Sequence, residues 1–393
     1  MHNSKLVWPF IGLVTIIYLA TLLFVRLENP LHLQHQCYTR WRSAYVVKQG
    51  KDKAFVNSSN KQKQPVALSE AQGYGLQITA LAGRKGWASQ SDFDRLLNYY
   101  LAHQDYVGSR KTALMQWRQA KNAKNKWTSN VNSATDGDLY IAEALGEAAK
   151  VWPRRAAYYH QLQRALLRDI LAYEYNPKTH ALTVGDWATK KSKYYTLMRT
   201  SDVMPTAFDE FYQVSHDQRW HLIKKQMLAR LSDLSKQHRT GLVPDFAWIS
   251  ETSARPVKPK TIASKNDGNY SANACRVPMM LASSKDPKAR QTLDKMMKFF
   301  SNQYYVTAGY TLSGQRLNHY QSASFSAPLF YAASCHRNQG YDNLFFSQKI
   351  VFSKHLPRDN YYDATLTTLA ALKGLHSPLA DKHLHFVGIR KYN

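Results

Sequence analysis

The chain has few cysteines and few acidic residues for its length. Of its 393 residues only three are cysteines (Cys37, Cys275 and Cys335), and no two of them have a CxxC spacing. Three cysteines exclude a disulfide scaffold, and the missing spacing argues against a structural zinc site of the common kind. Because 44% of the residues are hydrophobic and 12% aromatic, disorder over most of the chain is also excluded.

The shortage of acids leaves a strongly basic protein. There are 27 Asp and Glu against 53 Lys and Arg, which gives a formal net charge of +26. Such an excess favours an anionic neighbourhood, such as nucleic acid, an acidic polymer or a membrane surface. No familiar nucleic-acid-binding motif accompanies the basic clusters, so we expect no nucleic-acid partner and keep an anionic cell-wall polymer as a candidate.

The N-terminal region contains a long run without charge. Residues 6–25 read LVWPFIGLVTIIYLATLLFV, which is long enough to cross a hydrocarbon core as a helix. No small-x-small cleavage site follows the run, so we expect an uncleaved signal anchor behind a short tail at residues 1–5; secretion after signal cleavage is the alternative. This predicts a single-pass protein of the cell membrane with its bulk outside the cytoplasm.

The rest of the sequence predicts helices. After a juxtamembrane segment at residues 26–64, we expect one all-α domain over 65–393. The periodicity predicts about eleven helices, at residues 68–83, 92–103, 138–151, 155–173, 203–214, 217–238, 271–283, from 287, 321–335, 342–353 and 361–374. Strand alternation is limited to short pieces such as 181–184. So many helices in one unit suggest pairs closed into a ring, with a site among the loops at one mouth.

Two carboxylates stand at predicted helix starts. Ser69 and Gln72 have capping-box spacing, which places Glu70 in the first turn, and the small residues after it would let a ligand approach the backbone. Asp136 precedes an apolar helix. Each could simply complement a helix N-terminus. Together, two carboxylates from separate helices are what glycosidic cleavage requires.

Six motifs in one order resemble glycoside hydrolase family 8, which includes endoglucanases, chitosanases, lichenases and xylanases. The most specific is ATDGDLYIAEALGEAAKVW at residues 134–152. The others are SEAQGYG at 69–75, SDVMP at 201–205, GLVPD at 241–245, ANACRVP at 272–278 and YYD at 361–363. The resemblance covers about residues 65–375. It implies an (α/α)6 barrel, here preceded by the N-terminal transmembrane helix.

The resemblance also implies residue roles in an inverting mechanism. Glu70 matches the general acid, Asp136 the carboxylate that binds the sugar at the cleavage subsite, and Arg276 an arginine beside the catalytic base. Candidates for substrate binding or stacking on sugar faces are Trp127, Asn273, Tyr361 and Tyr362, although core packing would also explain the aromatic residues. No metal or organic cofactor is implied.

The base position departs from the family pattern. Asn273 stands where the best-known subgroup has Asp, and a neutral amide cannot take a proton from water at useful rates. Asp202 replaces the usual Tyr of another motif at the same site, so we expect it to act as the base. Asp267 and then Glu251 are the alternatives, and loss of the base is the remaining one.

The expected function is therefore a membrane-anchored, extracytoplasmic hydrolase that cuts a β-1,4-linked polysaccharide. A neutral glucan comes first, xylan second and an anionic polysaccharide after them. Chitosan ranks low, because a cationic polymer would call for an acidic cleft and the chain is strongly basic. Two alternatives remain open. One is a polysaccharide-binding protein that has lost hydrolysis, and the other is a surface protein that binds an anionic wall polymer. The sequence gives no signal of an oligomeric state.

Overall fold

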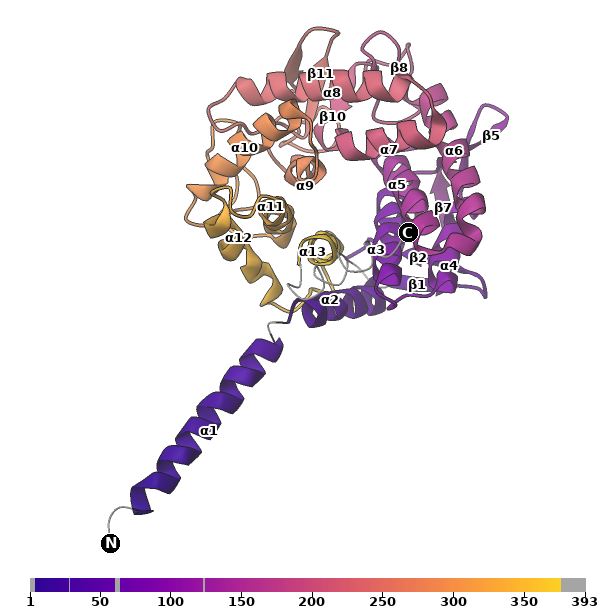
Figure 1. Cartoon of the computed structure of the whole chain (residues 1–393). Helices are drawn as coiled ribbons and strands as arrows, with labels where there is room; N and C mark the ends of the chain where they lie inside the picture. Colours follow the sequence, from indigo (N-terminus) through magenta and orange to yellow (C-terminus); the bar gives the residue numbers. More distant parts are fainter. Residues whose placement is uncertain (1–3, 28, 61–63, 123, 376–393) are drawn as a thin grey trace, which may run out of the picture.

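Twelve of the helices in the described part of the chain form a double ring (Figure 1). The computed structural model describes residues 4–27, 29–60, 64–122 and 124–375; side chains are described within α1 only at 8–21. The inner helices are α3 (Ser69–Arg84), α5 (Thr135–Val151), α7 (Pro205–Ser215), α9 (Val277–Leu281), α11 (Ala323–Cys335) and α13 (Tyr361–Gly374). The outer helices are α2 (Pro30–Tyr45), α4 (Gln90–Ala102), α6 (Ala156–Tyr173), α8 (Arg219–Lys236), α10 (Pro287–Ser301) and α12 (Asp342–Lys349).

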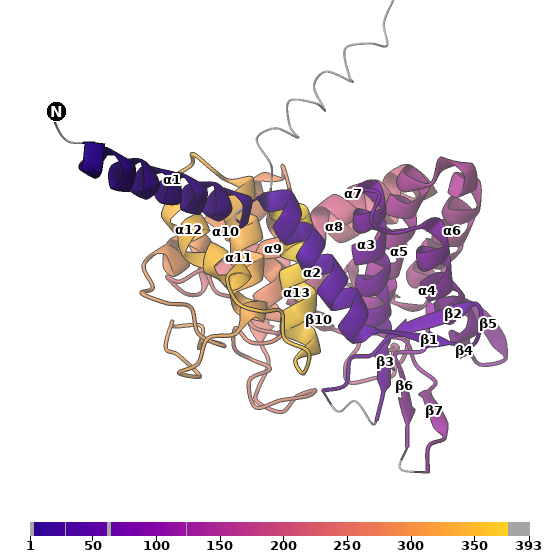
Figure 2. The same ribbon diagram turned by 90° about the horizontal axis from the view of Figure 1, so that it is seen from below.

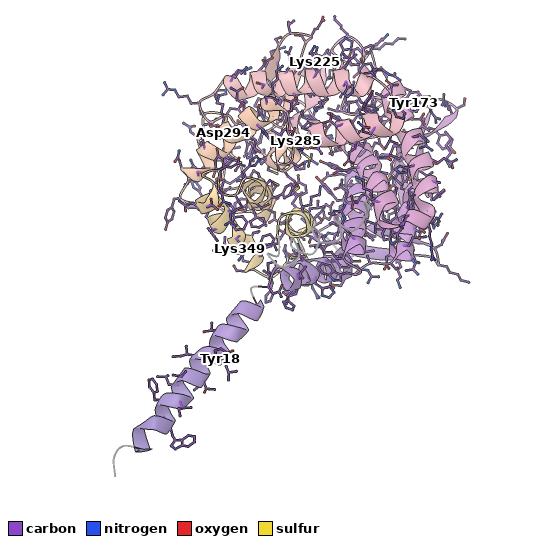
Figure 3. The ribbon with its side chains drawn as sticks, viewed as in Figure 1. Tyr18, Tyr173, Lys225, Lys285, Asp294 and Lys349 are labelled. Carbon is purple, nitrogen blue, oxygen red and sulfur yellow. The ribbon has the colours of Figure 1, made fainter. Side chains whose placement is uncertain are left out.

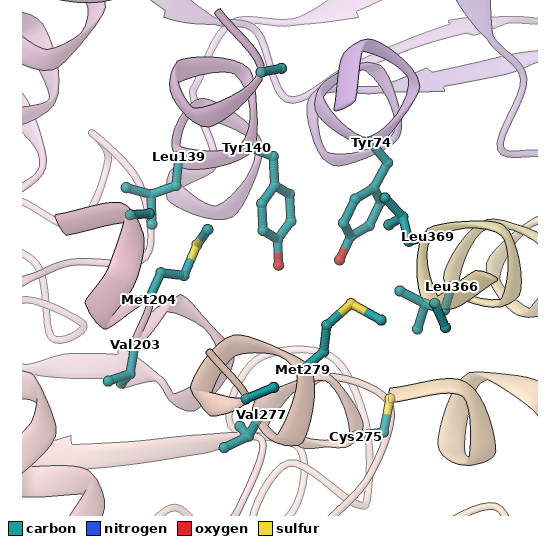
Figure 4. Packing of buried hydrophobic residues seen from close by; sticks show 14 of the residues in the cluster. Tyr74, Leu139, Tyr140, Val203, Met204, Cys275, Val277, Met279, Leu366 and Leu369 are labelled. Carbon is teal, nitrogen blue, oxygen red and sulfur yellow. The ribbon is translucent and has the colours of Figure 1, made fainter. Parts of the chain in front are cut away.

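This alternation of outer and inner helices is consistent with the expected (α/α)6 barrel. The middle of the ring is packed with side chains rather than open. Figure 4 shows Tyr74 of α3, Tyr140 of α5, Met279 of α9 and Leu366 of α13 converging on the centre. All four positions are buried or nearly so, and the rings of Tyr74 and Tyr140 stack with centroids 4.4 Å apart. The site must therefore lie at an end of the barrel.

The ring includes α2, which lies in the segment assigned above to a juxtamembrane stretch. Its Gln34 side chain donates to the backbone oxygens of Ala371 on α13 and of Leu375, the C-cap of α13. Trp41 Nε1 donates to Thr365 Oγ1 at 2.9 Å. The run of small and polar residues around these positions hid the amphipathic pattern of α2. Its packing closes the ring between the first and last inner helices.

The predicted cap of α3 and the predicted start of α4 are wrong. Leu68 is the N-cap of α3, and the Gln72 side chain is buried, where it bonds to the backbone of Ala54, Val56 and Leu96. Helix α4 begins two residues earlier than expected, with Ser89 and Asp92 forming the capping box. The helix expected from residue 287 does begin there: Asp286 is the N-cap of α10, and its side chain accepts from the backbone N–H groups of Lys288 and Ala289.

The structure contains more strand than the sequence predicted. Twelve short strands in the described residues form five small sheets: β1 (Val46–Gln49) with β2 (Lys53–Val56), β3 (Val66–Leu68) with β6 (Arg118–Lys121) and β7 (Trp127–Asn130), β4 (Gln104–Val107) with β5 (Arg110–Met115), β8 (Tyr175–Asn176) with β9 (Ala181–Leu182), and β10 (Leu197–Arg199) with β11 (Phe246–Ile249) and β12 (Ala254–Pro256). Strands of two to six residues are too short to show a period. Two expected helices are also interrupted: 271–283 contains the 3₁₀ turn Ala274–Arg276 before α9, and 342–353 ends in the turn Ile350–Phe352.

Figure 2 shows β3, β6, β7 and β10 on one side of the ring, beyond the N-terminal ends of α3 and α5. Helix α1 (Ser4–Leu27) leaves the ring on the opposite side. The described side chains of α1 are exposed, including Trp8 and Tyr18 (Figure 3). No helix among the described residues is long and apolar enough to cross a membrane; the expected span at 6–25 also takes in residues 6, 7 and 22–25, whose side chains lie outside those described.

Candidate active site

Close packing of α3 against α5 brings Glu70 and Asp136 together. A Cβ on Gly137 would lie 2.6 Å from the Cβ of Ser69, and one on Gly73 would lie 2.6 Å from the Cβ of Tyr140. Only glycine permits so short an approach at these points. Gly73, one of the small residues after Glu70, therefore serves the packing of α3 on α5. The approach of a ligand to this backbone stays a prediction. Both carboxylates lie in the first turns of their helices.

Arg276 connects the two carboxylates. Its Nη1 lies 3.5 Å from Glu70 Oε1 and 3.3 Å from Asp136 Oδ2, and it donates to the Tyr74 hydroxyl at 3.3 Å. The guanidinium is almost fully buried, with 1% of its side chain exposed. A buried cation between two acids holds them in a fixed relation and controls their charge.

Asn273, the residue at the expected base position, contacts Arg276. Its Oδ1 accepts a hydrogen bond from Arg276 Nη2 at 2.7 Å. Asp245 fixes this loop, because its Oδ1 accepts from the backbone N–H groups of Ser271, Asn273 and Ala274. Burial raises the pKa of Asp245 to about 7, against the effect of these three hydrogen bonds.

A second arginine joins Asp202 to this cluster. Arg199, on β10, places Nη1 2.7 Å from Asp136 Oδ1 and 3.5 Å from Asp202 Oδ2. Asp202 is 1% exposed, and neither of its oxygens accepts a hydrogen bond from a described residue. Glu70, Asp136 and Asp202 thus form one chain of charges through Arg276 and Arg199.

The surroundings of the three carboxyl groups shift their pKa values in different directions. Burial raises the pKa of Glu70 to about 6, although Arg276 opposes the rise. Burial also raises the pKa of Asp202 to about 7, again against Arg199. At Asp136 burial acts in the same direction, but Arg199 and Arg276 outweigh it and lower the pKa below its usual range. Asp136 is therefore ionised at neutral pH, while Glu70 and Asp202 each hold a proton part of the time.

The two alternative bases are in different surroundings. Asp267 is buried and accepts from the backbone N–H groups of Ile262, Ala263 and Ser264, so it organises a loop. Glu251 is exposed in the turn between β11 and β12. No described contact joins either residue to Glu70, Asp136 or Arg276.

The three aromatic candidates for sugar binding differ in how far they are exposed. Trp127 on β7 is 36% exposed, and its ring meets Phe55 edge to face at 5.3 Å. Tyr361 is buried and packs edge to face on Tyr45. The Tyr362 hydroxyl donates to Ala272 O at 2.6 Å, next to Asn273. Trp127 is therefore exposed and Tyr362 half-buried, whereas Tyr361 is part of the packing.

Comparison with known proteins identifies the family of the chain. The family profile described as "Glycosyl hydrolases family 8" matches residues 13–376. The chain belongs to glycosyl hydrolase family 8. It is 30% identical to a Beta-glucanase of Niallia circulans over 305 residues, 75% of this chain and 72% of the relative, and 28% identical to an Endoglucanase of a Bacillus species over 294 residues, 71% and 61%.

Solved family 8 structures have the same fold. The apo Beta-1,3-1,4-glucanase of Paenibacillus sp. X4 is 26% identical and has a TM-score of 0.77, with 88% of this chain and 92% of that one covered. A cold-adapted family 8 xylanase, 16% identical, has a TM-score of 0.72 over 89% and 92% of the two chains. The family assignment makes this protein a glycosyl hydrolase, and the resemblance seen in the sequence is confirmed.

Sequence reasoning missed four residues of this cluster. Arg199, Tyr74, Tyr140 and Asp245 all contact or position the cluster, and Arg276 lies 5.9 Å above the Tyr140 ring. Tyr74, Tyr140 and Asp245 stand inside motifs of the resemblance, which could have indicated them. Arg199 precedes its motif by two residues and carries no such signal. Over the residues described, no group of three or more His, Cys, Asp or Glu could hold a metal ion.

Proposed function

We propose that this protein cleaves β-1,4 bonds of a glucan-type polysaccharide by an inverting acid–base mechanism. Glu70 protonates the leaving oxygen, Asp136 binds the sugar at the point of cleavage, and Asp202 activates water from the other face. The names of the relatives, a beta-glucanase and an endoglucanase, support a glucan as substrate. The mechanism rests on the geometry of the three carboxyl groups.

The observation that carries the proposal is the contact of Arg276 with both Glu70 and Asp136, at 3.5 and 3.3 Å. It places a carboxyl group with a pKa of about 6 beside a carboxylate whose pKa is lowered. A general acid needs a proton near neutral pH, and a residue that interacts with developing positive charge on the sugar needs to be anionic. The two environments supply one of each.

Asp202 fits the base better than the alternatives. It shares Arg199 with Asp136, and its two buried oxygens accept no hydrogen bond from the described residues. Apart from the Arg199 ion pair at 3.5 Å, Asp202 has no charged or hydrogen-bonding partner among the described residues. A buried carboxylate with so little compensation costs free energy, and such costs are typical of functional positions. A water placed against it would both satisfy this group and be activated by it. In an inverting pair, the two carboxyl groups stand about 6.5–9.5 Å apart to leave room for that water.

One observation favours a second function. Asn273 occupies the usual base position and is held by Arg276 as a hydrogen-bond acceptor. If Asp202 does not reach the water, the same cleft would bind polysaccharide without cutting it.

The location of the protein is part of the proposal. Helix α1 carries exposed Trp8, Phe10 and Ile16, which no part of the ring covers in the described structure. An apolar helix that leaves the ring away from the strand side would hold the mouth toward a polymer at the cell surface. We therefore propose attachment to the membrane through residues 6–25, with the ring outside the cytoplasm.

The test compares hydrolysis of mixed-linkage β-glucan, carboxymethyl cellulose, xylan and chitosan by the full chain. Wild type is measured beside Glu70→Gln and Asp202→Asn, with Asp267→Asn and Glu251→Gln as matched amide variants. The proposal predicts cleavage of a glucan, with kcat lowered at least about 100-fold in the first two variants and less than about twofold in Glu251→Gln. Full activity in Asp202→Asn would assign the base elsewhere, and binding without cleavage by wild type would establish the second function.

A further inference from the structure

A basic pocket lies on the sheet that carries Arg199. It has a volume of about 400 Å³ and is lined mainly by Lys193, Tyr194, Trp248, Arg255, Lys258 and Lys260. A second hollow of about 390 Å³ shares Lys193, Trp248 and Arg255, so these three side chains lie between two adjoining depressions. We refer to both together as the basic pocket.

The charge of the basic pocket is uncompensated. Four cations line it, and neither hollow has an Asp or Glu in its lining. None of the four has an ion-pair partner among the described residues, whereas elsewhere a lysine such as Lys224 pairs with Asp209 at 2.6 Å. Glu251 stands in the adjacent turn but lines neither hollow. Clustered cations of this kind create a field that attracts an anion.

The same pocket has an aromatic wall. The half-buried ring of Trp248 lies nearly parallel to Tyr194, with 10° between the planes and centroids 6.4 Å apart. Trp187 meets Tyr194 edge to face at 5.3 Å, and Lys193 Nζ lies 4.9 Å from the Tyr194 centroid. These contacts hold the rings in place. A fixed aromatic wall offers apolar area to the carbon–hydrogen face of a sugar, and the cations would take its charged group.

The pocket is close to the carboxylate cluster. Leu197 of β10 pairs with Trp248 of β11, and Arg199, which contacts Asp136, is two residues further along β10. Two residues of a strand span about 7 Å. Strand β10 lies on the same side of the ring as β3, β6 and β7, whereas α1 leaves on the other side (Figure 2). The sheet that carries the pocket thus has its strand β10 on the side of the ring opposite to α1.

We propose that the basic pocket is a subsite for an anionic sugar residue, one that bears a carboxylate, within the polysaccharide cut at Glu70. This inference rests on the proposed function and extends it, because it makes the substrate a charged glucan-type polymer. Arg255 supplies a planar fork that matches a carboxylate, and the lysines supply point charges around it. Part of the excess positive charge of the chain, +26 in total, would thus bind the anionic substrate.

The test measures binding of two matched polymers, a neutral β-glucan and the same β-glucan after partial carboxymethylation. Binding is measured with the full chain carrying Glu70→Gln, so that cleavage does not interfere. The pocket is changed by Arg255→Gln with Lys258→Gln. The control, Arg164→Gln with Lys225→Gln, removes one arginine and one lysine from exposed positions on the outer helices α6 and α8.

We expect the pocket variant to weaken binding of the carboxymethylated polymer about tenfold or more at low salt, with a smaller effect at high salt, and to change binding of the neutral polymer less than twofold. The control should change neither. Equal losses for both polymers, or no loss for either, would overturn the proposal. Binding to vesicles of anionic phospholipid is measured in parallel. A pocket variant that loses binding to the vesicles but not to the carboxymethylated polymer would also overturn the proposal, because the pocket would then bind lipid.

The experiments distinguish a failure of the subsite proposal from a failure of the proposed hydrolysis. Failure of the Glu70-competent chain to cut either polymer would refute hydrolysis but leave the binding comparison readable. Unchanged kcat/KM ratios between the two polymers in an active pocket variant would refute the subsite alone. Circular dichroism and Tm show whether each variant is folded, and both pocket residues are exposed, so we expect no change.

Discussion

Asn273 Oδ1 accepts a hydrogen bond from Arg276 Nη2 at 2.7 Å, while Nη1 of the same arginine lies 3.5 Å from Glu70. The amide contributes no charge, so the full positive charge of Arg276 acts on Glu70 and Asp136. Arg276 thereby opposes the rise that burial causes in the pKa of Glu70 and keeps it at about 6. The presence of Asn273 at the usual base position therefore also affects the pKa of Glu70.

Replacing Asn273 with Asp should raise the pKa of Glu70. The new carboxylate would neutralise part of the Arg276 charge, and the proton on Glu70 would be held more tightly. We expect the alkaline limb of the kcat/KM profile to move up by about 0.5–1 pH unit. The control Asn302→Asp adds the same charge at the end of the outer helix α10 and should leave the limb in place. An unmoved or lowered limb in Asn273→Asp contradicts this reading of Arg276.

Arg199→Gln should impair both folding and catalysis. Its loss leaves Asp136 and Asp202 buried without their shared cation, and breaking such a buried pair costs about 3–5 kcal/mol. The pKa of Asp136 should rise, and kcat should fall about 100-fold or more. Urea unfolding and initial rates measure the two effects. Adding Asp202→Asn to the variant should restore part of the stability and none of the activity; additive losses would show that Arg199 does not couple the two acids.

Gly137→Ala should separate the two catalytic helices. The added methyl group meets Ser69 at the start of α3, and overpacking of this kind costs about 1–3 kcal/mol. Because Glu70 and Asp136 flank the contact, we expect kcat to fall by more than tenfold as their relation to Arg276 changes. Gly12→Ala is the matched control, since a Cβ there meets nothing within 4 Å. Equal kcat values for the two variants would show that the close contact of α3 with α5 does not position Glu70 and Asp136.

Stability should fall as the pH rises from about 5 to 8. Glu174 is fully buried, its Oε1 accepts from Ser133 Oγ at 2.5 Å, and burial raises its pKa to about 8. Between its pKa in the unfolded chain, about 4.5, and this value, the folded protein holds a proton that the unfolded chain has lost. The pKa of Asp105 is likewise raised by burial, to about 7.

The measurement is Tm at pH 5 and at pH 8, for which we expect a fall of a few degrees in the wild type. Glu174→Gln removes one titrating group and should make the fall smaller. Glu251→Gln, at an exposed carboxylate, should reproduce the wild-type fall. A Tm that rises over this range, or the same fall in Glu174→Gln, would contradict the account.

Much of the architecture was predictable because helices of more than ten residues show a clear period. The long segments of α5, α6 and α8 begin and end close to their expected bounds. The short strands were missed because two to six residues show no period, and α2 because its buried positions include Gln34 and Cys37 among polar neighbours.

The site was predictable only where motifs carried it. Glu70, Asp136 and Arg276 come from segments more than sixty residues apart, and their meeting depends on glycine contacts between α3 and α5 that no local pattern specifies. Arg199 was missed because a single arginine in a basic chain gives no signal. The expectation that Asp202 belongs to the cluster came from its place in a motif, and the structure puts it beside Arg199.

The most direct test of the central claim is the configuration of the first product. Proton NMR can follow the anomeric signal of the new reducing end while wild type cuts a β-glucan, before mutarotation equilibrates the anomers. An acid and a base acting across the cleft predict the α-anomer first. Initial release of the β-anomer would show that configuration is retained, and would contradict the assignment of Glu70 and Asp202 as an inverting pair.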